Sequence, residues 1–311
     1  MEIIRGMYNL RPRHHGAVVT IGNFDGVHLG HQAILGQVIR RARELGRPSM
    51  LICFEPQPKE FFDAFNAPAR LTRFREKVEL LAGLGLELVL CLPFNEKTRA
   101  MTAQGFVDLL ARDIRLSGLY VGDDFRFGAD RSGDFATLEA AGKTYRFDVT
   151  DINTLTFEDL RVSSTRIRER LTAGDFEGAE AMLGHPYAIT GRVMYGRQLG
   201  RQLDAPTANI QLHRYRAPIE GVYAVEVDGL GDRLRGVANV GVRPTLNEKN
   251  VKPILEVHVF DFNQNIYGRC MKVLFRHKIR DEQKFAGIDE LKAQIQRDIG
   301  AARDWFLEGQ N

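Results

Sequence analysis

The sequence predicts a chain of the α/β class with two domains: a doubly wound, Rossmann-like domain and then a small antiparallel β domain with a C-terminal helix. Three observations lead to this prediction. The 311 residues exceed the roughly 100 to 200 typical of one domain. Strand-like and helix-like segments alternate from residue 17 to about 172, whereas strand-like runs follow one another without helices after residue 186. We therefore expect domains over residues 1–184 and 185–311.

Short apolar runs rich in β-branched residues predict the strands of the first domain, and segments of helical period separate them. The expected strands are residues 17–22, 49–54, 86–94, 118–123 and 145–152. The expected helices are residues 31–46, 73–85 and 102–114. Such alternation favours a mostly parallel sheet, in which ligands bind beyond the carboxyl ends of the strands.

In the second domain, strand-like runs at hairpin spacing favour a small antiparallel barrel or sandwich. These runs are residues 189–196, 221–229, 233–242, 253–262 and 270–279. A segment of helical period with acidic residues near its start predicts a final helix over residues 288–307.

Composition excludes several classes of function. The 43 basic and 40 acidic residues are interspersed and leave a net charge of +3, so we expect no nucleic-acid partner. No apolar run approaches the roughly 20 residues that span a bilayer, so we expect no membrane association. Cys53, Cys91 and Cys270 lie in apolar runs without metal-ligand spacing, which predicts buried thiols and a cytoplasmic protein.

The segment GNFDGVHLGHQ, residues 22–32, leads from the first strand into a helix expected to begin between Leu29 and His31. Backbone N–H groups of a first helical turn bind anions, and His28 and His31 lie near one face of that turn. Two imidazoles there suit phosphoryl or nucleotidyl transfer, which depends on positioning and charge stabilisation. Asn23 and Asp25 are placed to orient an imidazole or contact phosphate. The alternatives are a glycine-rich turn with a surface histidine pair, or a two-histidine metal site.

The segment VSSTRIRERL, residues 162–171, places hydroxyl side chains at the start of a second helix, with Arg166 and Arg168 just inside it. Hydroxyls, free N–H groups and guanidinium groups together make a polyphosphate clamp. The simpler alternative is a capped helix with surface arginines.

Two polar features mark the second domain. In PTAN, residues 206–209, Thr207 and Asn209 can point to one side of an extended segment and offer oxygens to Mg²⁺ or phosphate. In LEVH, residues 255–258, alternation turns Glu256 and His258 away from the apolar face. By pattern alone, a polar hairpin is the alternative for PTAN, and a solvated outer face is the favoured explanation for Glu256 and His258.

GNFDGVHLGHQ followed by VSSTRIR resembles the nucleotidyltransferases of the H-x-G-H type, and the fuller resemblance is to the prokaryotic bifunctional riboflavin kinase/FMN adenylyltransferase (FAD synthetase) family. It covers nearly the whole chain, because CFEPQPKEFF (53–62), YVGDDFRFGADRSGD (120–134), PTAN, ANVGVRPT (238–245) and LEVH also fit. The resemblance implies a Rossmann-like nucleotidyltransferase domain and then a β-barrel kinase domain. ATP, riboflavin, FMN and FAD are the implied ligands, and Mg²⁺ the implied cofactor.

For the first domain, the resemblance implies that His28 and His31 stabilise the transition state as FMN phosphate attacks the α-phosphorus of ATP. It assigns the nucleotide to Asn23, Asp25, Gly30, Ser164, Thr165 and Arg168. It assigns the flavin to Phe54, Phe62, Asp124, Phe125 and Phe127. Taken singly, these phenylalanines are better explained as core residues than as flavin contacts.

For the second domain, the resemblance implies that Glu256 is the general base that deprotonates the riboflavin 5′-hydroxyl. Thr207 and Asn209 would bind Mg-ATP, Gly200 would contact the nucleotide, and Arg243 the flavin. The sequence departs from the family pattern at Asp204 and Ala205, where Gly-Phe is common, and at Tyr195, where histidine is frequent. The departures at Asp204 and Ala205 keep one alternative open: an adenylyltransferase with a weakened, flavin-binding kinase domain. A flavin-nucleotide sensor without turnover is a separate alternative, which the presence of His28, His31 and Glu256 disfavours.

Overall fold

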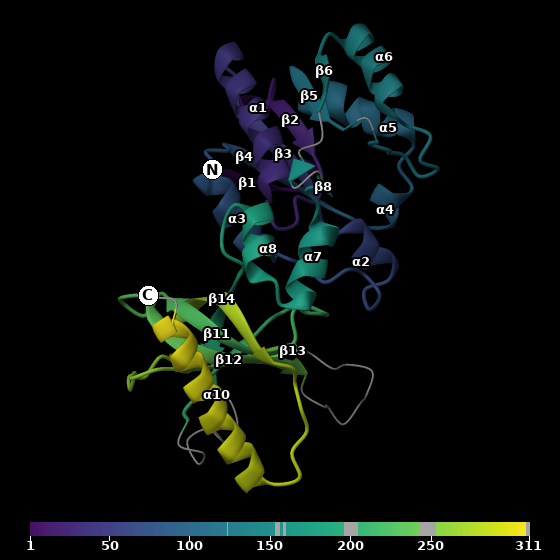
Figure 1. The fold of residues 1–311 in the computed structure, drawn as a ribbon. Coiled ribbons are helices and arrows are strands. Elements are labelled where there is room, and N and C mark those ends of the chain that lie inside the picture. The colour runs from purple at the N-terminus through teal and green to yellow at the C-terminus, as the bar shows by residue number, and fades with distance from the viewer. Residues whose placement is uncertain (123, 153–155, 158–159, 196–204, 243–252, 309–311) are drawn as a thin grey trace. The chain divides into compact units, whose positions relative to one another are not determined.

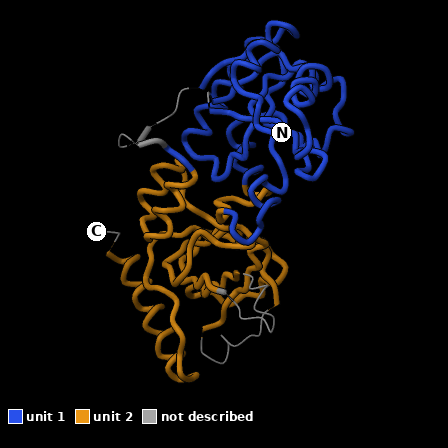
Figure 2. The backbone as a smooth tube through the Cα atoms, turned by 90° about the vertical axis from the view of Figure 1, so that its right-hand side faces the viewer, with its two compact units in different colours: residues 1–67, 77–163 blue, residues 68–76, 164–311 orange. Residues whose placement is uncertain are grey.

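The computed structural model describes residues 1–122, 124–152, 156–157, 160–195, 205–242 and 253–308. The chain divides into two compact units, shown in different colours in Figure 2. One unit comprises Met1–Ala67 and Lys77–Ser163, and the other comprises Pro68–Glu76 and Ser164–Asn311. Among the described residues, no helix is both long enough and apolar enough to cross a bilayer.

The first unit is built on a six-stranded sheet in the order β1-β4-β3-β2-β5-β6, and every strand pair in it is parallel. The strands are β1 (Glu2–Arg5), β2 (Val18–Ile21), β3 (Ser49–Glu55), β4 (Leu88–Pro93), β5 (Gly118–Val121) and β6 (Asp148–Asp151). This arrangement confirms the predicted doubly wound parallel sheet.

Helices cover both faces of this sheet because successive strand residues point to opposite sides. Val18 packs with Val38 and Ala42 of α1 (Leu29–Leu45) on one face. Val19 and Ile21 belong to the main core cluster, which also contains residues of α5 (Ala103–Asp108), the π-helical segment Leu109–Ile114 and α6 (Phe135–Tyr145). The remaining helices of the first half are α2 (Pro58–Phe62), α3 (Phe74–Gly83) and α4 (Glu96–Arg99).

The second unit contains a closed antiparallel barrel in the order β10-β13-β12-β11-β14-β9 (Figure 1). Its strands are β9 (Ala188–Met194), β10 (Ala208–Gln211), β11 (Gly221–Asp228), β12 (Leu234–Val242), β13 (Pro253–Val259) and β14 (Cys270–Arg280). Helix α10 (Ile288–Glu308) packs Ala302 and Phe306 against Val222 and Ala224 of β11. Helices α7 (Ser164–Ala173) and α8 (Phe176–Leu183) also belong to this unit, and the short β7 (Thr156–Phe157) and β8 (Leu160–Arg161) form a separate hairpin.

The strands and helices predicted from periodicity are present, and the barrel alternative is confirmed over the sandwich. Several elements were not predicted, among them β1, β7, β8, β10, α2, α4, α6 and α8. Helices α2 and α4, of five and four residues, are too short to show a helical period. Helix α6 begins directly after the segment assigned to flavin binding, residues 120–134. The strand predicted over 145–152 begins at Asp148 because α6 runs to Tyr145. Cys53 and Cys91 are buried as predicted, but Cys270 is exposed, because alternation turns the first residue of β14 outward.

Candidate active sites

Residues 22–28, here called the histidine loop, connect β2 to α1. His28 is the N-cap of α1, and its Nδ1 accepts a hydrogen bond from the backbone N–H of His31, at 3.3 Å. Phe24, Gly26 and Val27 have φ values of 47°, 83° and 43°, a left-handed conformation that is costly for phenylalanine and more so for valine. The loop therefore has an unusual backbone at the position where the sequence predicts the chemistry.

Three aromatic rings stack in this loop. The ring centroids of His28 and His31 are 3.6 Å apart, and those of Phe24 and His31 are 4.5 Å apart. Because Nδ1 of His28 accepts a hydrogen bond, the proton of the neutral His28 ring is carried by Nε2. The His28 ring therefore has a fixed orientation and a defined donor atom.

The electrostatic surroundings keep His31 neutral. Burial lowers the pKa of His31 well below its usual 6.5, and electrostatic interactions with His28 and Lys77 lower this pKa further. His31 Nδ1 is buried and has no hydrogen-bond partner among the described residues. A neutral His31 next to the free N–H groups of a helix can donate a hydrogen bond to phosphate without carrying a full charge of its own.

Gly30 has a packing role that the sequence did not suggest. A Cβ on Gly30 would lie 3.2 Å from both Cε1 and Nδ1 of His28. The structure shows that the lack of a side chain at Gly30 leaves room for the His28 ring. The nucleotide contact that the resemblance implies for Gly30 stays a prediction. Asp25 is buried within the same loop, and Asn23 at its start lies beside a cavity.

That cavity has a volume of about 720 Å³ and lies within the first unit. Four of the five residues predicted to bind flavin line it: Phe54, Phe62, Phe125 and Phe127. The rings of Phe125 and Phe127 stack, with centroids 5.7 Å apart. The fifth residue, Asp124, is exposed and not among the lining residues; its Oδ1 would lie 2.9 Å from a Cβ on Gly122. The structure thus brings the predicted aromatic residues together and leaves Asp124 outside the cavity.

Sequence reasoning missed much of the cavity wall. Phe94, which follows β4, makes edge-to-face contact with Phe54 and Phe62, and Phe106 of α5 lies 5.0 Å from Phe127. Three arginines also line the cavity: Arg99, Arg126 and Arg131. Phe94 gave a usable signal, because residues that follow parallel strands meet at the ligand-binding edge of the sheet. No comparable signal pointed to Phe106, because it lies on α5, which packs against a face of the sheet and does not follow a strand.

The segment VSSTRIRERL forms the start of α7, as predicted, with Ser164 as its first residue. Thr165 is exposed and Ser164 is partly exposed. Arg168 Nε donates a hydrogen bond to the carbonyl oxygen of Ala69, at 2.5 Å, which holds this side chain against the neighbouring backbone. These residues belong to the second unit and the histidines to the first, so the predicted clamp around one nucleotide stays a prediction.

In the barrel, Glu256 lies in a row of polar residues across three strands. The register pairs Glu256 of β13 with Asn209 of β10 on one side and with Asn239 of β12 on the other. Leu255, Val257 and Val259 are buried, which confirms that the polar face of β13 carries Glu256. Asn239 Nδ2 donates to Glu282 Oε1 at 3.4 Å, while Asn239 Oδ1 is buried without a partner among the described residues. The carboxylate predicted to act as a base is therefore flanked by two carboxamides.

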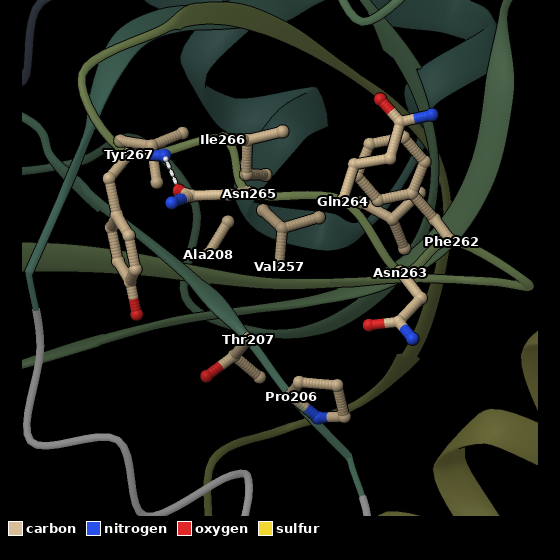
Figure 3. A pocket seen from close by; sticks show the side chains of 12 residues that line it. Pro206, Thr207, Ala208, Val257, Phe262, Asn263, Gln264, Asn265, Ile266 and Tyr267 are labelled. Atoms are coloured by element: carbon tan, nitrogen blue, oxygen red, sulfur yellow. Dashed lines mark hydrogen bonds between the residues drawn. The ribbon is translucent and has the colours of Figure 1, made fainter.

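A second cavity, of about 120 Å³, is lined by Ala208, Val257 and Val259, on the buried face of their strands, and Glu256 is not among its lining residues (Figure 3). Thr207 lies on one side of it, and residues 262–267, a segment with three carboxamide side chains, lie on the other. Tyr195 stacks on Tyr267, which lines the cavity, with ring centroids 4.0 Å apart. Ala205 is buried, and Asn209 is buried but not among the lining residues. Gly200, Asp204 and Arg243 lie outside the described residues.

Fold and sites together define a chain of two parts: a parallel α/β unit with a stacked histidine pair at a helix N-terminus, and a β-barrel with a carboxylate flanked by two carboxamides. Two family models match the chain: one described as FAD synthetase covers residues 10–166, and one described as riboflavin kinase covers residues 183–306. The chain therefore belongs to the bifunctional riboflavin kinase/FMN adenylyltransferase family. It is an enzyme with both activities, the FAD synthetase part being N-terminal and the kinase part C-terminal.

Similar proteins cover the chain along its whole length. The bifunctional riboflavin kinase/FMN adenylyltransferase of Escherichia coli (strain K12) is 50% identical over 309 residues, 98% of each chain. That of Pseudomonas fluorescens is 50% identical over 304 residues, 97% of each chain. A crystal structure described as a macrolide-efflux protein from Streptococcus pneumoniae is 29% identical, with a TM-score of 0.80 over 97% of this chain and 99% of that one.

Proposed function

We propose that the first unit transfers the adenylyl group of ATP to FMN at His28 and His31. An oxygen of the FMN phosphate attacks the α-phosphorus of ATP, and pyrophosphate leaves. The two rings donate hydrogen bonds to the phosphate oxygens, where negative charge is rearranged in the transition state. The observation that carries this proposal is the stacked histidine pair at the N-terminus of α1, in which His28 is held by its own helix cap.

The aromatic cavity of the first unit is proposed to hold the flavin. Its volume of about 720 Å³ falls in the usual range of small-molecule sites, about 300 to 1,000 Å³. Phe54, Phe62, Phe125 and Phe127 offer ring faces and edges to an isoalloxazine. Asn23 links the two sites, since it belongs to the histidine loop and lines this cavity. Asp124 is proposed to contribute only from outside the cavity wall.

The nucleotide of this reaction is assigned to two segments. Asn23, Asp25 and Gly30 belong to or adjoin the histidine loop, where the first N–H groups of α1 favour an anion. Ser164, Thr165 and Arg168 are proposed to hold the outer phosphates. The start of α7 at Ser164 supports this, because the hydroxyl groups of Ser164 and Thr165 then lie at the helix N-terminus, together with the first backbone N–H groups.

For the kinase reaction, Glu256 is the proposed general base. It takes the proton of the riboflavin 5′-hydroxyl, whose oxygen attacks the γ-phosphorus of ATP, and ADP leaves. Asn209 and Asn239, its cross-strand neighbours, support this role because their amides can orient the carboxylate and the hydroxyl. Gly200 is proposed to contact the nucleotide and Arg243 the flavin.

Mg²⁺ is the proposed metal of both steps, bound with ATP. Among the described residues no cluster of three histidine, cysteine or acidic side chains offers a complete metal site. The oxygens of Thr207 and Asn209 are the neutral, hard ligands that suit a magnesium ion held chiefly by nucleotide phosphates. There the ion would neutralise phosphate charge.

We assign the adenylyltransferase domain to residues 1–184 and the kinase domain to residues 185–311. The matched ranges 10–166 and 183–306 support this boundary. The cytoplasm is the proposed location, because two free, buried thiols, Cys53 and Cys91, suit a reducing compartment.

A chromatographic time course tests these roles. The purified chain is incubated with ATP and Mg²⁺, starting from riboflavin in one series and from FMN in the other. We expect FMN and then FAD from riboflavin. His28→Ala is expected to slow only FAD formation, by about 10²-fold to 10³-fold, the usual cost of one preorganised donor. Full FAD formation by His28→Ala would overturn the adenylyl-transfer proposal.

A further inference from the structure

Lys77 is fully buried, which is rare for a lysine without a specific partner. It lies in the first turns of α3, and its Nζ donates a hydrogen bond to the carbonyl oxygen of Asn23, at 2.7 Å. Removing an ammonium group from water is costly, so an apolar side chain of similar length would fill this space more cheaply. The choice of lysine therefore calls for an explanation beyond packing.

The partner of Lys77 is the histidine loop, which needs to be held. Left-handed φ values at Phe24 and Val27 cost energy, and such backbone persists only where its surroundings impose it. Two hydrogen bonds of the loop are local: the N–H of Val27 donates to the carbonyl of Phe24 at 3.3 Å, and Gln32 Nε2 donates to the carbonyl of Val27 at 2.9 Å. The N–H of Gly22 donates to the carbonyl of Ile52 in β3 at 3.0 Å. Lys77 comes from a separate helix, more than fifty positions along the chain, and secures the start of the loop.

The charge of Lys77 also affects His31, which follows the histidine loop in the first turn of α1. Together with burial and His28, it lowers the pKa of His31. Lys77 therefore favours a neutral His31 ring, because a protonated ring would bring a second positive charge close to the ammonium group. The neutral ring stacks on His28 and Phe24.

We infer that Lys77 is a positioning residue for adenylyl transfer: through Asn23 it fixes the histidine loop so that the His28 and His31 rings face the reacting phosphates in one arrangement. Lys77 does not touch the substrate in this scheme. The inference rests on the proposed role of the two histidines and adds to it the residue that holds them.

Lys77→Met tests the inference in the full chain, because it keeps the length of the side chain and removes its charge and its donor. We expect kcat for FAD formation to fall about 10²-fold, the effect of a displacement of about 1 Å at a reacting group. The KM for FMN and the quenching of FMN fluorescence on binding should change less than about threefold, since the aromatic wall is intact. Riboflavin kinase activity of the same molecules should be unchanged, which controls for folding of the barrel.

Lys143→Met is the matched control, because Lys143 is exposed on α6 and is not among the residues that line the cavity. It should retain both activities. An unchanged kcat in Lys77→Met would overturn the inference, as would an equal loss of FMN binding, which would make Lys77 a structural residue only. His28→Ala distinguishes failure of the proposed role of the histidines from failure of the inference on Lys77. If His28→Ala keeps full FAD formation, the proposed role of the histidines is wrong, whatever the result for Lys77→Met.

Discussion

Gly30→Ala is the substitution for which the structure predicts a clear loss of activity and little change in stability. Gly30 is the second residue of α1, and its backbone does not need a left-handed conformation. The added Cβ would lie 3.2 Å from two atoms of the His28 ring, closer than ordinary van der Waals contact. The ring must then move by a few tenths of an ångström or more, and the 3.3 Å cap bond from His31 is the contact most easily lost.

The expected magnitudes follow from these contacts. Loss of an N-cap hydrogen bond costs about 1 kcal/mol, whereas alanine is better than glycine inside a helix by up to about 1 kcal/mol. The free energy of unfolding should therefore change by less than about 1 kcal/mol. Displacement of His28 should slow FAD formation by about tenfold to 10²-fold, because transition-state contacts are sensitive to small displacements.

Gly36→Ala on the same helix is the control, since its Cβ would meet no atom within 4 Å. That variant should be slightly more stable and fully active. The assay is FAD formation from FMN and ATP, followed by chromatography, together with urea unfolding of both variants. Full activity of Gly30→Ala would refute the argument that glycine makes room for the catalytic ring.

Three further predictions concern the other sites and the pH dependence. Phe125→Ala should weaken FMN binding by about tenfold through the loss of one stacking face, as measured by fluorescence quenching; unchanged binding would remove the flavin from this cavity. Glu256→Gln should slow phosphorylation of riboflavin by about 10²-fold or more while FAD formation from supplied FMN continues, and loss of both activities would contradict the assignment. The folded state lowers the pKa of His31 below 6.5, so below that pH the unfolded chain binds a proton more readily than the folded chain, and the free energy of unfolding falls as the pH falls. In urea unfolding, His31→Asn should therefore lose less stability than the parent between about pH 7.5 and about pH 5.5. Equal losses in the two proteins would show that His31 is not responsible.

Local patterns in the sequence were sufficient for the two-part architecture and for several site residues. Strand and helix periods are set by successive residues, so the parallel sheet, the barrel strands and the polar face of β13 could be read directly. His28 and His31 could be placed at a helix start because glycines and a strand precede them within ten residues. These features depend on neighbours in the chain, which the sequence displays.

The tertiary structure alone decided which distant residues meet. Phe94 and Phe106 complete the aromatic cavity of the first unit, Asn239 pairs with Glu256 across the strands, and Lys77 Nζ donates to the carbonyl oxygen of Asn23. Each of these contacts depends on strand register or on helix packing between segments far apart in sequence. Neither strand register nor helix packing produces a periodic pattern of residues that could be recognised in the sequence. The packing role of Gly30 has the same origin, because the His28 ring becomes its neighbour only when His28 caps α1.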